Sequence, residues 1–113
     1  MDYLYQWEKL PLSEREKLIE LESKHLVRIV LGEKKICVAK LDDAYYGIND
    51  RCPHAGTPLT IAKTCNKRGI VTCPTHHYKF DIKSGRSADG NEYKIPNYKF
   101  KEVDGEWHIG IRR

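Results

Sequence analysis

The segment LVRIVLGEKKICVAKLDDAYYGIN spans residues 26–49 and has the pattern of three consecutive β-strands. Its three runs are rich in β-branched and aromatic residues, and they are separated by Gly32-Glu33 and Asp42-Asp43, pairs that favour tight hairpin turns. The C-terminal end repeats this pattern, because Asp104-Gly105 lies between two further runs of the same kind. We therefore predict an all-β protein whose antiparallel strands form a sandwich or a partly open barrel.

Two other regions depart from the strand pattern. The segment LSEREKLIEL (residues 12–21) opens with Ser13 and has Glu16 three positions later, a capping-box pattern that predicts a short helix. Its apolar residues are also compatible with the start of a strand. Residues from about 50 to 97 carry four of the five prolines. We expect one domain over residues 1–113, with a loop-rich subdomain over about 50–97 inserted in the β scaffold.

Composition and charge exclude several classes of protein. The chain has 113 residues and a net charge of +4, which is too weak and too dispersed to indicate a nucleic-acid-binding surface. No window has the roughly 18 apolar residues of a membrane span. The first ten residues, MDYLYQWEKL, lack the features of a secretory signal. We therefore expect a cytoplasmic protein in which the four cysteines are ligands or core residues rather than disulfides.

Two short motifs within residues 50–97 combine cysteine with histidine. Cys52 and His54 form a C-x-H pattern, and Cys73 and His76 form a C-x-x-H pattern. A proline directly follows each of these cysteines, which stiffens a tight loop whose side chains must converge. Two thiolates and two imidazoles make a complete set of four metal ligands. A structural zinc site remains open as an alternative, because Cys₂His₂ is also a standard zinc set.

The chain resembles the Rieske iron–sulfur proteins over roughly residues 34–113. The resemblance rests on YYGINDRCPHAGTPL (45–59), GIVTCPTHHYKFDIKSG (69–85) and IPNYKF (95–100). It implies the Rieske fold and one [2Fe–2S] cluster per chain, with Cys52 and Cys73 on one iron and the two histidines of the motifs, His54 and His76, on the other.

Several positions differ from the high-potential Rieske proteins of respiratory and photosynthetic chains. Those proteins carry two further cysteines where this chain has Thr57 and Thr75, and a serine and a tyrosine where it has Tyr78 and Phe80. With fewer hydrogen bonds to sulfur, the reduced cluster is less stabilised, so we expect a low-potential centre at roughly −150 mV. His77 occupies a position where the family usually has glycine, which suggests a residue with positive φ.

The resemblance implies an electron carrier without a catalytic site of its own. We expect a Rieske-type ferredoxin that passes single electrons from a reductase to a terminal oxidoreductase such as a ring-hydroxylating oxygenase. The alternative is a Rieske-like small subunit of an oxidoreductase complex such as nitrite reductase, and a structural zinc-binding module is more remote. A self-sufficient oxygenase would need a mononuclear iron with two histidines and a carboxylate, for which the chain offers no second domain.

The remaining cysteines and charges have simpler interpretations. Cys37 alternates with apolar residues in a predicted strand and should pack in the core, and Cys65 lies in the connection between the two motifs. We expect the cations that flank the loops to be mainly solvated, although they could steer an acidic redox partner; these are Lys63, Lys67, Arg68 and Lys79.

Overall fold

Eight strands and three helical segments make up the computed structural model, which describes residues 4–54, 56–62, 66–75 and 77–112. The helices are α1 (Leu12–Ile19) and the 3₁₀ turns η2 (Glu20–Glu22) and η3 (Leu59–Ala62). The strands are β1 (Tyr5–Lys9), β2 (Val27–Leu31), β3 (Lys34–Leu41), β4 (Ala44–Asn49), β5 (Ile70–Thr72), β6 (Lys79–Asp81), β7 (Asn97–Val103) and β8 (Glu106–Arg112).

Six strands form one antiparallel sheet in the order β1-β8-β7-β4-β3-β2. The predicted hairpins β2–β3, β3–β4 and β7–β8 are all present, and each turns at the residue pair that the sequence indicated. Asp42 and Asp43 adopt φ of 50° and 65°, as a two-residue turn between twisted strands requires. Strand β1, which the sequence analysis did not predict, pairs with β8 and extends the sheet.

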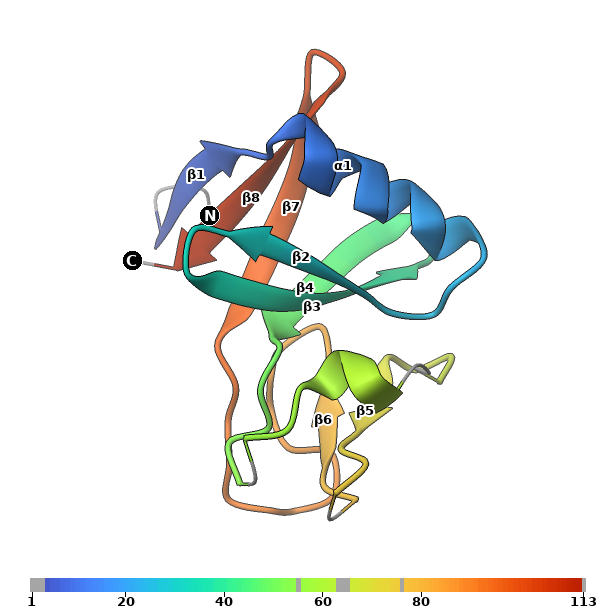
Figure 1. Cartoon of the computed structure of the whole chain (residues 1–113). Coiled ribbons are helices and arrows are strands. Elements are labelled where there is room, and N and C mark those ends of the chain that lie inside the picture. The colour runs from blue at the N-terminus through green and yellow to red at the C-terminus, as the bar shows by residue number, and fades with distance from the viewer. Residues whose placement is uncertain (1–3, 55, 63–65, 76, 113) are drawn as a thin grey trace.

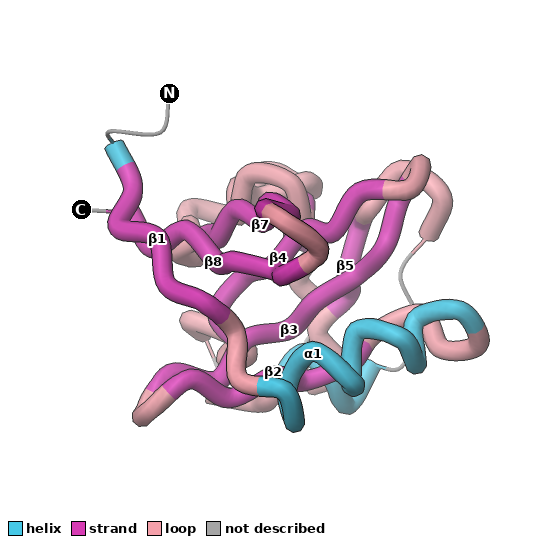
Figure 2. The backbone as a smooth tube through the Cα atoms, turned by 90° about the horizontal axis from the view of Figure 1, so that it is seen from above, coloured by secondary structure: helices cyan, strands magenta, loops and turns pink. Residues whose placement is uncertain are grey.

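The sheet curls on itself into a half-barrel (Figures 1 and 2). Strands β1 and β2 are its two edges, and α1 lies beside β2 at the open side. Leu18 of α1 is fully buried and packs with Ile29, Ile36 and Ile109 in the barrel core. The prediction of a partly open antiparallel barrel is therefore confirmed.

Helix α1 begins two residues earlier than the capping box indicated. Its N-cap is Pro11, whose carbonyl accepts hydrogen bonds from the amides of Glu14 and Arg15. Ser13 therefore lies inside the first turn and donates to Glu14 instead of capping the helix. The buried Glu14 carboxylate also accepts from the Val30 amide at 2.7 Å, which satisfies a donor of the edge strand β2.

Strand β3 forms a wall between two hydrophobic cores. Ile36 and Val38 pack in the barrel core, whereas Cys37 and Ala39 pack in a second core beneath the sheet. All four are at most 1% exposed. Their continuous apolar run is thus the signature of a strand covered on both faces. The expectation that Cys37 packs in the core agrees with this burial.

The chain between β4 and β7 forms a small lobe (residues 50–96) below the barrel (Figure 1). Its only regular sheet within the described residues is the pair β5–β6. The two connections to the barrel run side by side, because the Asn49 amide donates to the Pro96 carbonyl at 3.0 Å. The hydroxyl of Tyr98 donates to the Asn49 side chain at the same junction. No helix of the described residues is long and apolar enough to cross a membrane.

Candidate metal centre

Two loops of the small lobe carry the Cys/His motifs. The first loop (residues 51–58) follows β4 and leads into η3, and the second loop (residues 73–78) joins β5 to β6. Three of the four predicted ligands are described: Cys52 and His54 in the first loop and Cys73 in the second. His76 lies outside the described residues, as does Cys65. Within the described part of the chain, no group of three or more potential metal ligands converges.

The two loops repeat the same backbone turn. The amide of Cys52 donates to the Thr57 carbonyl five residues later, and the amide of Cys73 donates to the Tyr78 carbonyl, both at 2.8 Å. In return, each cysteine carbonyl accepts from the amide four residues later, at 2.7 Å from Gly56 and 2.9 Å from His77. Each loop therefore closes on its own cysteine.

The residue that closes each turn has a left-handed backbone. Gly56 has φ of +72° and His77 has φ of 63°. The expectation that His77 would occupy a glycine-like position is thus confirmed by its backbone. Histidine is one of the few side-chain-bearing residues that adopt this conformation at modest cost.

The cysteines and the described histidine differ sharply in exposure. Cys52 is 1% exposed and Cys73 is 0% exposed, and both belong to the core of the small lobe with Phe80 and Leu59. His54 is exposed at the surface of the same lobe. Two buried thiols and a solvent-facing imidazole fit a cluster with one sulfur-ligated iron inside and one histidine-ligated iron outside.

A comparison with protein families identifies this arrangement. Residues 13–99 match the family model described as the Rieske [2Fe-2S] domain, which is most of the chain. The chain belongs to the Rieske [2Fe–2S] domain family. The cofactor of such a Rieske domain is a [2Fe–2S] cluster, as the resemblance implied.

Individual relatives agree with this assignment. The human protein apoptosis-inducing factor 3 is 33% identical over 70 residues, 62% of this chain and 11% of that protein, so the chain spans a small part of that relative. The anthranilate 1,2-dioxygenase ferredoxin subunit of Burkholderia cepacia is 29% identical over 84 residues, 73% of this chain and 75% of the subunit. The ferredoxin of carbazole 1,9a-dioxygenase from Nocardioides aromaticivorans IC177 has the same fold, with a TM-score of 0.73 at 19% identity over 96% of this chain and 99% of that one.

The two threonines that replace the extra cysteines of high-potential Rieske proteins meet across the loops. The Oγ1 atoms of Thr57 and Thr75 form a hydrogen bond at 2.5 Å. In this Rieske domain, the first and second loops are therefore joined by a non-covalent bond. The contact was not predicted, because the two threonines are 18 residues apart and no local pattern links them.

Two tyrosine rings lie beside the imidazole of His54. The imidazole lies 4.6 Å from the Tyr78 ring and 5.8 Å from the Tyr93 ring, measured between centroids. The two tyrosine rings are themselves 5.8 Å apart. Tyr78 thus has a packing role beside His54. Phe80, the position of a tyrosine in high-potential Rieske proteins, is fully buried and has no hydroxyl to donate.

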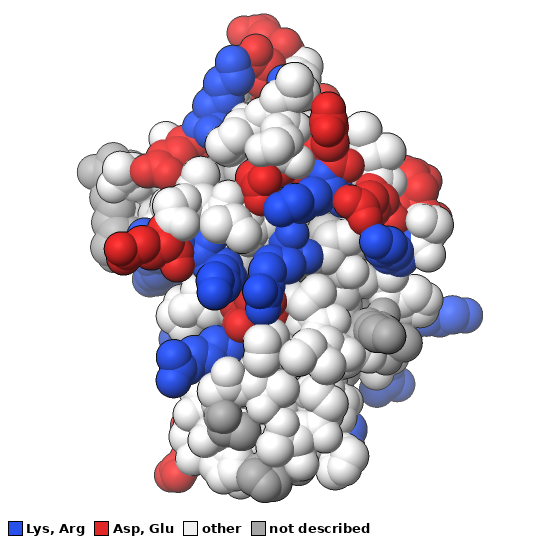
Figure 3. All heavy atoms as spheres, in the orientation of Figure 1, with Lys and Arg blue, Asp and Glu red and all other residues white. Residues whose placement is uncertain are grey.

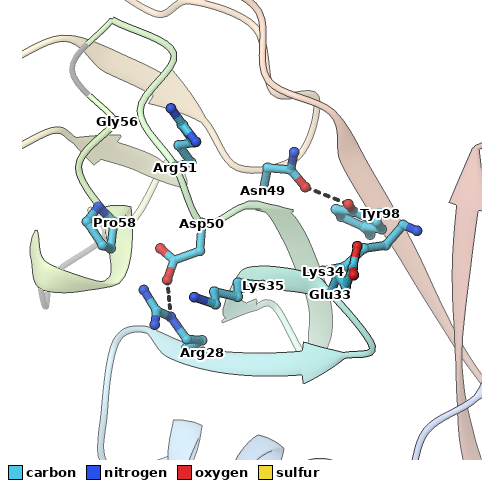
Figure 4. Close-up of a pocket in the computed structure, with 10 residues that line it drawn as sticks. All are labelled: Arg28, Glu33, Lys34, Lys35, Asn49, Asp50, Arg51, Gly56, Pro58 and Tyr98. Atoms are coloured by element: carbon cyan, nitrogen blue, oxygen red, sulfur yellow. Dashed lines mark hydrogen bonds and ion pairs between the residues drawn. The ribbon is translucent and has the colours of Figure 1, made fainter.

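A buried carboxylate that the sequence analysis missed fixes the start of the first loop. Asp50 is 5% exposed and accepts a hydrogen bond from the Arg28 guanidinium of β2 (Figure 4). It accepts another from the Thr60 amide at 2.7 Å. Its own amide donates to the Lys35 carbonyl at 2.8 Å. Asp50 therefore connects the barrel, the first loop and η3 two residues before Cys52.

Proposed function

We propose that this Rieske domain is a one-electron carrier of the ferredoxin type, which accepts electrons from a reductase and delivers them to a terminal oxidoreductase such as a ring-hydroxylating oxygenase. Similarity to the anthranilate 1,2-dioxygenase ferredoxin subunit, which extends over most of both chains, supports this class of partner. The proposal includes a cytoplasmic location and a single domain over residues 1–113, in which residues of about 50–97 hold the cluster.

The proposed ligands are Cys52 and Cys73 for one iron and His54 and His76 for the other. The observation that carries this assignment is the pair of equivalent turns, each closed on a buried cysteine. Because each cysteine amide and carbonyl is already hydrogen-bonded within its loop, the backbone that carries each sulfur is held in place by the protein itself. His76 is included as a ligand on the basis of the sequence motif and the family resemblance.

The chain's own residues define how an electron can enter and leave. When bound, the [2Fe–2S] cluster takes up and releases one electron. The buried cysteines keep the inner side of the site away from water, whereas the exposed imidazole of His54 forms the outer edge. Tyr78 and Tyr93 restrict the orientation of that imidazole through their ring contacts. Rapid transfer then requires only that a partner touch this edge.

Anaerobic purification from iron-replete cells tests the proposal. We expect a red-brown protein with two irons and two labile sulfides per chain. Protein-film voltammetry near neutral pH should give a midpoint well below zero, at roughly −150 mV. The reduced protein should be reoxidised when it is mixed with the oxidised terminal component of a ring-hydroxylating dioxygenase. A colourless protein that contains stoichiometric zinc, or a midpoint above roughly +100 mV, would contradict this function.

A further inference from the structure

A pocket beside the first loop has a basic lining that electron transfer alone does not explain. It has a volume of about 470 Å³ and lies between the β2–β3 hairpin and the loop that carries Cys52 and His54. Gly56 and Pro58 form the loop side of the pocket, and Lys34 and Lys35 form the hairpin side (Figure 4). Anything that enters this pocket therefore touches the loop to which we assign two cluster ligands.

The pocket carries an excess of positive charge. Arg28, Lys34, Lys35 and Arg51 line it, against the carboxylates of only Glu33 and Asp50. Asp50 is already satisfied by Arg28 and by the Thr60 amide. The side chains of Lys34, Lys35 and Arg51 are exposed, and within the described residues none of them forms an ion pair. Figure 3 shows lysine and arginine side chains gathered on this face, between the barrel and the small lobe.

With Arg28 paired to Asp50, three cations face the single carboxylate of Glu33 in the pocket lining, and this excess of positive charge is neutralised best by carboxylates from outside. Lysine suits brief encounters, because its flexible stem and hydrated ammonium bind a carboxylate without a fixed geometry. A redox carrier must dock and dissociate quickly, and complementary charge mainly accelerates that encounter.

We propose that this pocket receives carboxylate side chains from an acidic surface of the redox partner protein and thereby seats the partner against the first loop. The inference rests on the proposed electron-carrier function and adds to it the charge and the position of the docking surface. It also differs from the expectation that the cations at the start of β5 and β6 steer the partner. The two basic regions can be distinguished, since Lys67 and Arg68 lie outside this pocket.

A matched pair of double variants tests the proposal on the cluster-loaded protein. Lys35→Glu/Arg51→Glu reverses two pocket charges, and Lys67→Glu/Arg68→Glu reverses one lysine and one arginine elsewhere in exposed positions. Both variants have the same net charge. The probe is a carboxylate-terminated monolayer on gold, on which a quartz crystal microbalance measures adsorbed protein and voltammetry measures the electron-transfer rate. Arg28 is left unchanged, because its substitution would also break the contact with Asp50.

We expect the pocket variant to adsorb about tenfold more slowly at low salt, the control variant to change much less, and the difference to disappear at high salt. Equal losses in both variants would overturn the proposal, because only net charge would then matter. Release of the wild type by millimolar phosphate at constant ionic strength, with no release by chloride, would also overturn it and indicate a small-anion site. The microbalance measures adsorbed mass and does not depend on the cluster. Failure of the proposed electron-carrier function would instead be recognised by a colourless protein.

Discussion

The barrel and the small lobe are stabilised in different ways. In the barrel, six strands form a continuous antiparallel ladder around an apolar core, so its stability is distributed over many equivalent hydrogen bonds. In the described part of the small lobe, the paired strands are β5 and β6 with two isolated bridges, and single contacts such as those of Asp50 and Thr57 position the loops. A repeated pattern of backbone pairing thus supports the fold, whereas individual side chains determine the geometry of the metal centre.

Removal of a proposed cluster ligand should give the largest effect, because the small lobe should lose its cluster while the barrel stays folded. Cys73→Ser and His76→Ala should each abolish the visible absorption of the cluster while far-UV circular dichroism still reports the strands. Among the described residues, the barrel core contains none from the small lobe, so the barrel has its own source of stability. His77→Gly is the control and should keep two irons per chain. An intact cluster in His76→Ala together with cluster loss in His77→Gly would overturn the ligand assignment.

Loss of the carboxylate at the junction should give the next largest effect. Asp50→Ala leaves the Thr60 amide without its acceptor and Arg28 without its partner. Because the guanidinium is partly exposed and can recover water, we expect a loss of about 2–3 kcal/mol in the free energy of unfolding. Chemical denaturation measures this value, and the rate of cluster loss to a chelator should increase in parallel. An unchanged chelation rate would show that Asp50 does not control the first loop.

Loss of the buried Glu14 carboxylate should give a smaller decrease in the free energy of unfolding, and this effect should be confined to the barrel. Burial opposes ionisation of Glu14, but hydrogen bonds from Lys17, the Val30 amide and Ser13 together hold its pKa below the ordinary value. Glu14→Gln should therefore cost about 1–2 kcal/mol of unfolding free energy. This loss should be constant above about pH 5, the upper end of the ordinary titration of glutamate, and should shrink as the pH falls through the lowered pKa. Denaturation of both proteins from pH 7 to pH 3 measures it, and a difference that grows on acidification would contradict the mechanism.

The two closing residues of the loops should respond in opposite directions. Gly56→Ala adds a side chain to a backbone with φ of +72°, which should cost about 1 kcal/mol. The added Cβ would lie 3.5 Å from the Arg51 side chain, an ordinary contact, so backbone strain is the main cost. His77→Gly removes the same strain and should gain a similar or smaller amount. Thermal unfolding of the two variants measures both values, and shifts of the same sign would contradict the equivalence of the two turns.

Removal of the Thr57–Thr75 hydrogen bond between the loops should have the smallest effect on stability. Thr57→Val and Thr75→Val each remove one partner of the exposed hydrogen bond, which is worth about 0.5–1 kcal/mol. We expect a faster release of iron to a chelator and little change in the melting temperature. The double variant should be no worse than either single variant, because both remove the same bond. Additive losses would show that the threonines act separately.

The sequence specified the barrel well because its signals are local. Pairs such as Asp42-Asp43 and Asp104-Gly105 place the turns, and alternation along the adjoining runs places the strands. The proposal of Cys52 and Cys73 as ligands also came from a local signal, since a proline follows each of these two cysteines. The N-cap is Pro11 and not the predicted Ser13, because the helix starts two residues earlier than the capping box indicated.

The contacts that hold the small lobe were not predictable in the same way. Arg28 and Asp50 are 22 residues apart and belong to elements that do not pair with one another, so no periodicity links them. The same holds for Thr57 and Thr75, which approach only because the two turns face each other. Strand β1 was missed because its pairing with β8 joins the two ends of the chain.

The doubly covered strand β3 also has a consequence for how the protein can evolve. Most strands of an open barrel have one side on which random substitutions accumulate at little cost. Between Ile36 and Ala39 no such side exists, because each residue in turn fills one core or the other. We therefore expect mutational drift to be slow across these four positions and fast at the adjoining exposed pair Lys34 and Lys35. The docking charge could then be retuned for a new partner without disturbing the wall on which both cores depend.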